Sequence, residues 1–196
     1  IDMPRAVALY DRIGPAREIS GGSAANTIAG VAHLGGRTAY VGKVKDDQLG
    51  RIFAHDLRAR GAVYETPLAA RDSEQETGRC IILVTGDGER SMNTYLGWSE
   101  FLTPADIDEG QMAEAEWIYL EGYRFDGPAS HEAFAKAIRA CKGAGGRVSI
   151  TLSDPFCVER HRDAFRKMIV EDVDLLFANR AELLSMYQTD DFGAAL

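Results

Sequence analysis

An amide and a carboxylate with a spacing that could serve a ligand stand near the C-terminal end of the sequence. Asn179 and Glu182 are separated by two residues and follow the apolar run 173–177. An Asn at a helix N-cap and a Glu three residues later form a capping box, which is a purely structural arrangement. The same oxygen atoms also suit Mg²⁺ with its bound waters and a phosphate group. The spacing alone leaves both interpretations open.

A second group that could bind a polar ligand lies in residues 20–36, which read SGGSAANTIAGVAHLGG. Gly21 and Gly22 lack Cβ atoms, so the backbone can take a positive φ and approach a ligand closely. Asn26 follows in the first turn of the predicted helix, and its amide donor and acceptor suit two neighbouring hydroxyls. The N–H groups at a helix N-terminus favour a polar ligand. The alternative is a tight turn before a packed helix.

Polar side chains also follow four predicted strands, at the point where each strand ends. In open α/β sheets, ligands bind at the carboxyl ends of parallel strands, so the pattern predicts a polar site that binds hydroxyls and a metal. The structural alternatives are a helix N-cap for Asp46 and Asp47, a solvated loop acid for Glu121, and, for Asp154, a residue that only shapes the turn before Pro155. The residues concerned are Asp46 with Asp47, Glu121, Ser153 with Asp154, and Asn179 with Glu182.

The elements that must position these groups alternate between strand and helix from residue 117 onward. Such alternation indicates βαβ crossovers and a parallel sheet. Predicted strands are 38–44, 78–85, 90–96, 117–121, 147–152 and 173–177, and predicted helices are 49–60, 130–142, 159–170 and 180–187. Residues 18–35 are predicted as a turn and a helix, residues 3–12 as a short helix or an irregular entry, and residues 122–128 as a loop. A further short helix is expected to start at Thr103-Pro104, with Thr103 as its N-cap.

The strands 78–85 and 90–96 are joined by Gly86-Asp87-Gly88-Glu89, a hairpin signal. The hairpin has few apolar residues on one face, so we expect an edge or a lid. Arg90 could reach a ligand only if such a lid closes.

Composition restricts the classes of partner. The 196 residues carry a net charge of −8 and a pI near 5.0, which makes nucleic acid and an anionic membrane poor partners. Cys80, Cys141 and Cys157 have no metal-binding or disulfide spacing, and we expect reduced thiols in a cytoplasmic protein. The histidines share no metal-ligand spacing. No Walker loop and no G-x-G-x-x-G follows a strand, which disfavours a P-loop kinase and a dinucleotide-dependent dehydrogenase.

The block 21–50, GGSAANTIAGVAHLGGRTAYVGKVKDDQLG, resembles the N-terminal signature of the ribokinase-like (phosphofructokinase-B) family of carbohydrate and nucleoside kinases. The segments ILVTGDGERSMNTYLG, YLEGY, SDPF and FANRAEL are most similar to the adenosine-kinase-like sugar kinases. Two positions depart from the family pattern: Ile28 replaces a small residue, and Lys45 stands where glycine is favoured. The resemblance implies an α/β fold, three-layer α/β/α with a mainly parallel sheet and a small β lid. Residues 1–196 would form one domain, incomplete at both ends, with lid strands within 62–100.

The resemblance further implies an ATP-dependent kinase that transfers the γ-phosphoryl group to a primary hydroxyl of a sugar or nucleoside. ATP and Mg²⁺ would be its cofactors, and a small-molecule substrate its partner, with a possible homodimer through the lid. By this analogy Gly21, Gly22, Asn26 and Glu121 bind the substrate hydroxyls. Asn179 and Glu182 would place Mg²⁺ and phosphate, with Glu182 as the metal-side carboxylate.

One expected motif is missing from the sequence. The family's general base is an aspartate in a G-A-G-D motif at a helix N-terminus, and residues 193–196 (GAAL) begin similarly but carry no aspartate. We therefore expect these 196 residues alone to be inactive as a kinase, because phosphoryl transfer depends on positioning and charge stabilisation. The alternatives are a non-catalytic sugar- or nucleoside-binding module and, less favoured, a structural α/β domain.

Overall fold

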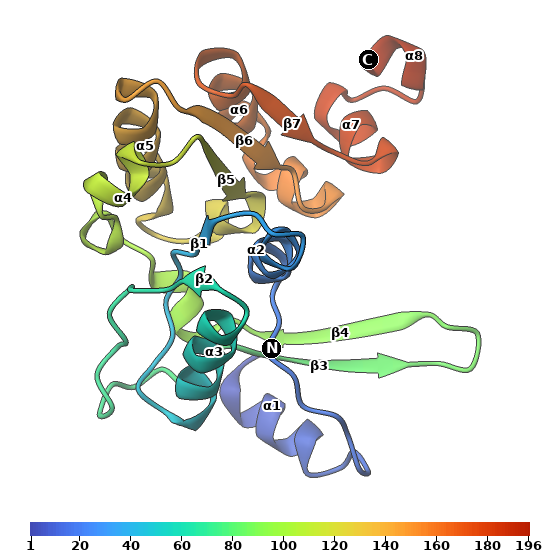
Figure 1. Ribbon diagram of the computed structural model, residues 1–196. Coiled ribbons are helices and arrows are strands. Elements are labelled where there is room, and N and C mark those ends of the chain that lie inside the picture. The colour runs from blue at the N-terminus through green and yellow to red at the C-terminus, as the bar shows by residue number, and fades with distance from the viewer. The chain divides into compact units, whose positions relative to one another are not determined.

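The computed structural model describes all residues from Ile1 to Leu196 (Figure 1). The chain forms two compact units, Ile1–Phe101 and Leu102–Leu196, which we call the N-terminal and C-terminal units and describe one at a time. No helix in either unit is both long enough and apolar enough to cross a bilayer.

The N-terminal unit begins with helices and two very short parallel strands. A small core joins α2 and α3 to the chain that follows them, and it contains Ala25, Val44, Ala54, Leu57 and Tyr64. Tyr40, Phe53 and Tyr64 meet there in edge and tilted ring contacts. The elements are α1 (Met3–Tyr10), α2 (Ser23–His33), β1 (Thr38–Ala39), α3 (Gln48–Ala59) and β2 (Ala62–Val63).

The strand predicted at 38–44 is much shorter in the structure. Only Thr38 and Ala39 pair with β2. Farther along, the Ala69 amide donates to the Val44 carbonyl at 2.9 Å, so the pairing resumes after a gap. In the gap the Tyr64 hydroxyl donates to the Gly42 carbonyl at 2.8 Å. A side chain from a distant position thus satisfies a backbone group that a regular ladder would have used.

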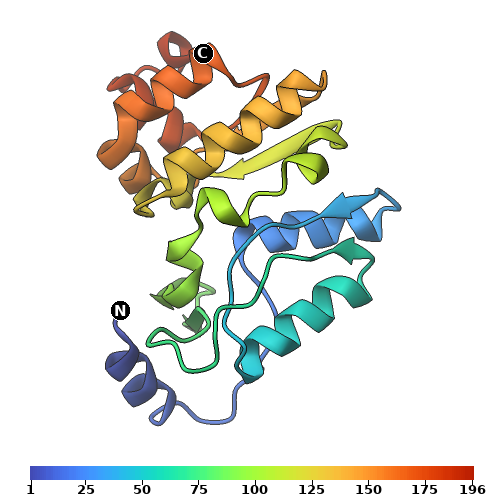
Figure 2. The same ribbon diagram turned by 90° about the vertical axis from the view of Figure 1, so that its left-hand side faces the viewer.

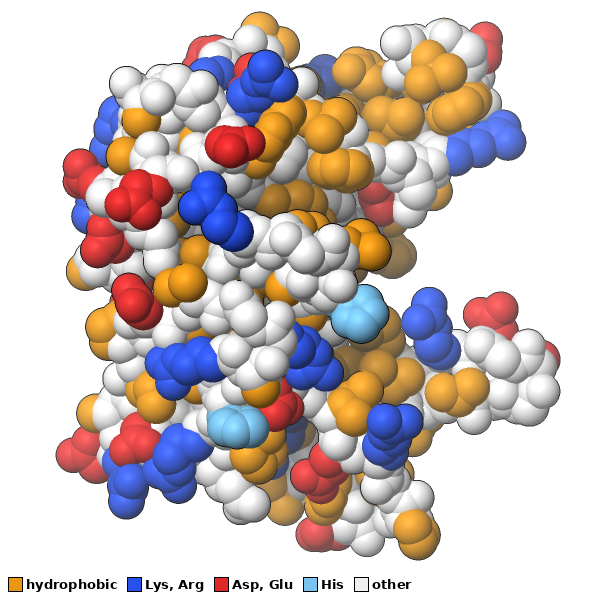
Figure 3. All heavy atoms as spheres, in the orientation of Figure 1, with side chains coloured by type: hydrophobic (Ala, Val, Ile, Leu, Met, Phe, Trp, Pro, Cys, Tyr) orange, Lys and Arg blue, Asp and Glu red, His pale blue; other side chains and the backbone are white.

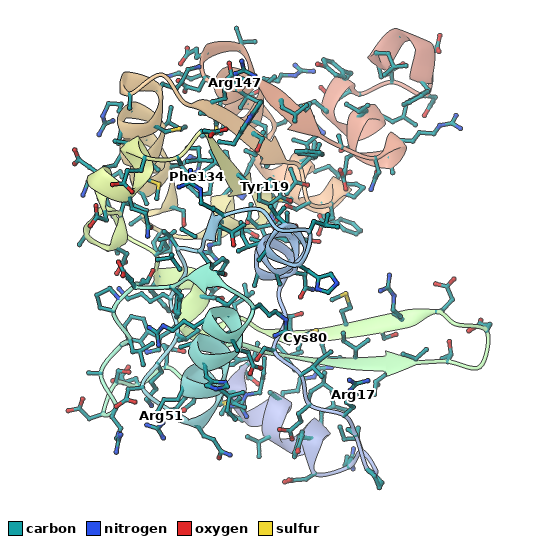
Figure 4. All side chains as sticks on the ribbon, in the orientation of Figure 1. Arg17, Arg51, Cys80, Tyr119, Phe134 and Arg147 are labelled. Atoms are coloured by element: carbon teal, nitrogen blue, oxygen red, sulfur yellow. The ribbon has the colours of Figure 1, made fainter.

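The predicted hairpin is confirmed, as β3 (Arg79–Val84) and β4 (Arg90–Tyr95). The two strands pair antiparallel, with Arg79 opposite Tyr95 and Val84 opposite Arg90. The buried strand residues lie near the root, at Ile81 and Tyr95, and large side chains are exposed farther out. Figure 3 shows hydrophobic side chains along this projecting hairpin, and Figure 4 labels Cys80 close to its root.

The C-terminal unit contains the predicted parallel sheet. Strands β5 (Trp117–Glu121), β6 (Arg147–Thr151) and β7 (Leu175–Phe177) lie in the order 5-6-7. They alternate with α5 (Ser130–Gly143), α6 (Pro155–Glu171) and α7 (Arg180–Tyr187), and α5 packs against β5 and β6 (Figure 2). Val148, Ile150 and Leu152, along and just after the central strand, are fully buried. The βαβ prediction from residue 117 onward is confirmed.

Helix α6 starts four residues earlier than the predicted 159–170. It begins at Pro155, with Asp154 as its N-cap, and it contains a kink where His161 has φ −125° and ψ 20°. Proline at the first helical position has no N–H that needs a partner, so the start is favourable. The segment predicted as a loop after β5 is a 3₁₀ helix, Gly122–Asp126.

Short elements complete both units. They are the 3₁₀ helices Gly97–Phe101 and Pro104–Asp106, helix α4 (Glu109–Ala113) and helix α8 (Phe192–Ala195). The expected start of a short helix at Thr103-Pro104 is confirmed, with Thr103 and Asp106 forming a capping box.

Candidate functional site

The N-terminus of α2 presents the predicted hydroxyl-binding groups to solvent. Gly22 is the N-cap with φ 113°, a conformation that L side chains rarely adopt, and no side chain caps the helix. Gly21 is exposed but does not share the positive φ, so only one of the two glycines is required by backbone conformation. The Asn26 side chain is exposed in the first turn, where its amide can donate and accept.

The turn before α2 is tied to α3. The Ser20 hydroxyl donates to the Asp56 carboxylate over 2.5 Å, and this hydrogen bond leads the causes that lower the pKa of Asp56. Ala25, in the first turn of α2, is 4% exposed and packs in the core with Val44 and Tyr64. The Ser20–Asp56 hydrogen bond fixes the chain before α2, and the buried Ala25 fixes the first turn of the helix. Asn26 is therefore exposed on a rigid element, as a binding residue requires.

Two strand ends of the C-terminal unit bring Glu121 and Ser153 together. Glu121, the last residue of β5, is 9% exposed and pairs in register with Thr151 of β6. The Ser153 hydroxyl donates to the Glu121 carboxylate and accepts a hydrogen bond from the Tyr123 amide at 3.0 Å. The carboxylate predicted to touch substrate hydroxyls is therefore oriented by a neighbouring side chain rather than loosely solvated.

Gly122 is required at this junction for steric reasons. A Cβ there would lie 2.4 Å from the Thr151 carbonyl oxygen and 2.8 Å from the Ser153 hydroxyl. The ends of β5 and β6 thus approach more closely than any other residue allows. The close approach is what lets the Ser153 side chain reach Glu121.

Ser153 has an unusual backbone conformation that the sequence interpretation missed. Its φ is 73°, and the Asp154 amide donates to the Leu152 carbonyl at 2.9 Å across it, which is the pattern of a strained γ-turn. Strain of this kind costs about 1–3 kcal/mol and is commonly found at functional sites. A signal existed in the sequence: Pro155 keeps Asp154 extended, so the chain must turn one residue earlier.

Two ionisable groups beside this junction are held neutral. Burial and the nearby Asp154 carboxylate raise the pKa of Tyr123. Burial raises the pKa of the Cys157 thiol to about 12, and its sulfur lies 3.3 Å from the Gly122 carbonyl oxygen. A thiol with such a pKa is not a nucleophile at neutral pH, so Cys157 packs rather than reacts.

The aspartates after two of the strands act as helix caps. Asp154 accepts from the Cys157 amide at 2.6 Å at the start of α6, and Asp47 accepts from the Gly50 amide at 2.7 Å at the start of α3. Asp46 pairs with Arg51 at 2.7 Å and with Arg71 at 3.1 Å. The capping interpretation given above to Asp46 and Asp47 therefore holds for Asp47 alone, and Asp154 is a cap as well.

Asn179 and Glu182 form a reciprocal capping box at the start of α7. The Glu182 amide donates to Asn179 Oδ1 at 2.9 Å, while the Asn179 amide and Nδ2 donate to the two Glu182 oxygens at 2.9 and 2.7 Å. Glu182 is 5% exposed. Each carboxylate oxygen keeps a second lone-pair direction, through which it could bind a metal directly or through water. The two side chains lie together, as their spacing predicts.

A separate charged cluster joins the 3₁₀ helix after β5 to α6. Asp126 accepts from Arg160 at 3.1 and 2.7 Å and lies 2.5 Å from His161 Nε2, at the helix kink. Burial raises the pKa of Asp126, but the hydrogen bonds and charges of Arg160 and His161 outweigh it and lower the pKa. His161 thus has a structural partner. No group of three or more His, Cys, Asp or Glu side chains is arranged to hold a metal.

Comparison with known proteins points to one family. The profile of the pfkB family carbohydrate kinases matches residues 12–195. A fructokinase from Klebsiella pneumoniae is 30% identical over 143 residues, which is 72% of this chain and 45% of the relative. Two solved structures superpose on the whole chain with a TM-score of 0.94. They are an adenosine kinase from Sinorhizobium meliloti (49% identical) and a probable sugar kinase from Rhizobium etli CFN 42 (51% identical), and the chain covers 59% of each.

These likenesses confirm the predicted ribokinase-like α/β/α fold with parallel strands. They also show that the chain spans about half the length of the curated relatives it matches.

Proposed function

This chain belongs to the pfkB family of carbohydrate kinases, and from that membership we propose that the protein transfers the γ-phosphoryl group of ATP to a primary hydroxyl of a sugar or nucleoside. The observation that supports the proposal most directly is the uncapped N-terminus of α2, with Gly22 at positive φ and the Asn26 amide exposed beside it. This arrangement suits two adjacent hydroxyls, which sugars and ribosides share.

Four residues bind the substrate in this proposal. Gly21 and Gly22 allow the substrate to approach the backbone, and Asn26 hydrogen-bonds its hydroxyls. Glu121, oriented by Ser153, accepts from a further hydroxyl. A buried carboxylate that is already hydrogen-bonded discriminates well, because a ligand without the matching hydroxyl leaves it underpaired.

Asn179 and Glu182 handle Mg²⁺ and phosphate in this proposal. The chemistry that magnesium supplies when bound is neutralisation of phosphate charge. The Glu182 carboxylate is held by two donors from Asn179, so its orientation is fixed before any ligand arrives. Such a group binds the ion through its remaining lone pairs, directly or through one water.

Adenosine and fructose are the two acceptors to test first. The 49% identity to the Sinorhizobium meliloti adenosine kinase over the whole chain favours a nucleoside, and the similarity to the Klebsiella pneumoniae fructokinase favours a hexose. We also infer that the protein is cytoplasmic, in keeping with three free cysteines, and that residues 1–196 belong to one ribokinase-like domain. A homodimer through the β3–β4 hairpin stays a prediction.

A second candidate is a sugar- or nucleoside-binding module without transfer chemistry. The observation in its favour is the sequence 193–196, which lacks the aspartate of the family's G-A-G-D motif. We infer that these 196 residues alone bind a substrate weakly and transfer no phosphoryl group.

ADP release in the presence of ATP, Mg²⁺ and either adenosine or fructose tests the proposal. If the native polypeptide is longer than 196 residues, the assay uses it, with the 196-residue chain in parallel. Asn26→Ala should raise KM about tenfold, equivalent to one lost hydrogen bond, whereas the exposed neighbour variant Thr27→Ala should not. Calorimetric binding without any ADP release would instead support the binding module.

A further inference from the structure

The segment 73–77 is hydrogen-bonded to the chain on both sides of the β3–β4 hairpin. It lies immediately before β3, and we call it the hairpin bracket. On the side of β4, the Trp98 amide donates to the Glu76 carbonyl at 3.0 Å, and the indole N–H donates to the Ser73 hydroxyl at 2.9 Å. The Tyr95 hydroxyl donates to Gln75 at 2.8 Å and accepts from the Glu76 amide at 3.2 Å.

A buried lysine holds the bracket from the other side. The Lys45 ammonium donates to the Ser73 carbonyl and to the Glu76 carboxylate, both at 2.9 Å. Its side chain is 7% exposed, whereas that of Glu76 is 33% exposed. A buried ammonium is stable only when it is paired and hydrogen-bonded, so these two contacts account for its position.

Thr77 adds a second attachment between the same segments. Its hydroxyl accepts from the Lys45 amide at 3.0 Å and donates to the Asp47 carboxylate at 2.8 Å. The Thr77 amide also donates to Asp47 at 2.9 Å. Asp47 is at the same time the N-cap of α3, so the bracket is fixed to the start of a helix whose residues Ala54 and Leu57 lie in the core.

Outside the bracket, the hairpin is contacted by the start of the chain: α1 touches both strands, and the Ile1 ammonium donates to the Thr94 carbonyl at 2.8 Å. Most side chains of the hairpin beyond Ile81 are exposed. A two-stranded sheet is marginally stable by itself. Its direction is therefore set at the root, where the bracket connects it to the remainder of the N-terminal unit.

We propose that Lys45 is a positioning residue that fixes the β3–β4 hairpin through the bracket. The role of Lys45 in fixing the hairpin does not depend on the proposed function. Only its consequence rests on that function: a hairpin that is held less firmly covers the substrate less well. The Lys45 ammonium supplies both the ion pair with Glu76 and the hydrogen bond to Ser73. Glu76 is its matching carboxylate.

Hydrogen exchange of backbone amides tests the proposal on the 196-residue chain. Lys45→Met keeps the apolar stem and removes the charge. We expect the paired hairpin amides to exchange about tenfold faster, with the amides of α3 changing less than about twofold. Lys45→Arg should restore protection, because a guanidinium can donate to the same two oxygens. Arg71→Ala is the matched control. Arg71 lies in the same loop as the bracket, but its side chain is exposed and pairs with Asp46 and not with Glu76.

Equal acceleration of hairpin and α3 amides would overturn the proposal, because Lys45 would then stabilise the unit as a whole. Unchanged hairpin exchange would also overturn it. If Lys45→Met fails to fold, Glu76→Gln takes its place in the experiment. This variant removes the negative charge that pairs with Lys45 and keeps an acceptor oxygen. Equal acceleration of hairpin and α3 amides, or unchanged hairpin exchange, would again overturn the proposal.

The kinetic consequence is measured separately in the ADP-release assay. Lys45→Met should raise KM for the accepted substrate about fivefold and leave kcat within about twofold. Faster hairpin exchange with an unchanged KM would support the role of Lys45 in fixing the hairpin but would reject the idea that the hairpin covers the substrate. Absence of kinase activity in the native polypeptide, with either adenosine or fructose as the acceptor, would reject the proposed function, while the exchange result would still decide the role of Lys45.

Discussion

The hydroxyl of Ser153 donates a hydrogen bond to the carboxylate of Glu121, from just beyond β6 to the end of β5. Two adjacent strand ends are thereby joined by side chains as well as by the backbone ladder. The bond depends on the positive φ of Ser153 and on the missing side chain at Gly122. The carboxylate of Glu121, a candidate substrate-binding group, is thus oriented by a side chain whose own backbone is strained.

Substitutions at Ser153 separate the hydrogen bond from the strain. Ser153→Ala removes the hydroxyl and keeps a Cβ at positive φ, whereas Ser153→Gly removes both. We expect the glycine variant to be more stable than the alanine variant by about 1 kcal/mol, although both should be less stable than the parent. Urea unfolding midpoints measure the order. An alanine variant as stable as the glycine variant would show that the turn is unstrained.

Glycine substitutions at two positions should have opposite effects on stability. Gly122→Ala places a Cβ 2.4 Å from a backbone oxygen, so the strand ends must separate. We expect it to lower the free energy of unfolding by about 2 kcal/mol or more. Gly30→Ala, in the middle of α2 with open space around it, should raise it by about 0.5–1 kcal/mol.

Thermal or urea unfolding of both glycine variants decides the matter. A Gly122→Ala variant with parental stability would mean that the two strand ends adjust easily. In that case Ser153 and Glu121 are not held at a fixed separation.

Variants of the capping box should distinguish its structural role from a role in catalysis. Asn179→Ala removes the N-cap and should cost about 1 kcal/mol of stability. Glu182→Gln keeps one acceptor oxygen, which can complete the box with the Asn179 amide, but it loses the acceptor for Asn179 Nδ2, so stability should fall by about 0.5–1 kcal/mol. If Glu182 also serves Mg²⁺, the glutamine variant should need more Mg²⁺ for half-maximal ADP release. An unchanged Mg²⁺ requirement would leave Glu182 with capping alone.

The Asp126 cluster should make stability depend on pH on the acid side. Its pKa is lowered in the folded state, because Arg160 and His161 outweigh the effect of burial. A carboxylate whose pKa is lower in the folded state stabilises the protein fully at pH values above its unfolded pKa, which is about 3.9. This stabilisation is lost as the pH falls through the lower folded pKa. Asp126→Asn should therefore destabilise the protein at pH 7, and the difference from the parent should shrink below about pH 4.

Chemical denaturation at a series of pH values tests this expectation. Glu132→Gln serves as a control, since Glu132 is an exposed carboxylate on the neighbouring helix α5. A difference between Asp126→Asn and the parent that stays constant from pH 7 to about pH 3 would contradict the role given to the ion pairs.

Local patterns predicted much of the C-terminal unit and the hairpin of the N-terminal unit. The apolar run before Asn179 predicted a strand. The N-x-x-E spacing left a capping box and a Mg²⁺–phosphate role both open, and the capping box does form. The Asp-Gly signal at 87–88 likewise predicted the turn between β3 and β4. Each of these features depends on residues close together in the chain, which is why a single sequence carries them.

Features that depend on distant partners could not be predicted. The strand predicted at 38–44 was wrong in extent because Tyr64, some twenty positions later, takes the Gly42 carbonyl. The burial of Lys45 follows from Glu76 and Ser73, which no local pattern connects to it. At the candidate site, Glu121 was identified from its place at a strand end, but its orientation by Ser153 required the pairing of β5 with β6.

The exposed β3–β4 hairpin also has a consequence for the behaviour of the protein at high concentration. Residues 80–85, CIILVT, combine high β-propensity with no charge and no proline, which is the composition of an aggregation-prone segment. Ile82, Leu83 and Val84 are 48%, 40% and 65% exposed, so folding hides little of the segment beyond Ile81. Charged residues flank it, Arg79 on one side and Asp87, Glu89 and Arg90 on the other, and they serve as gatekeepers against edge-to-edge association. Neutralising them should lower the concentration at which the protein precipitates.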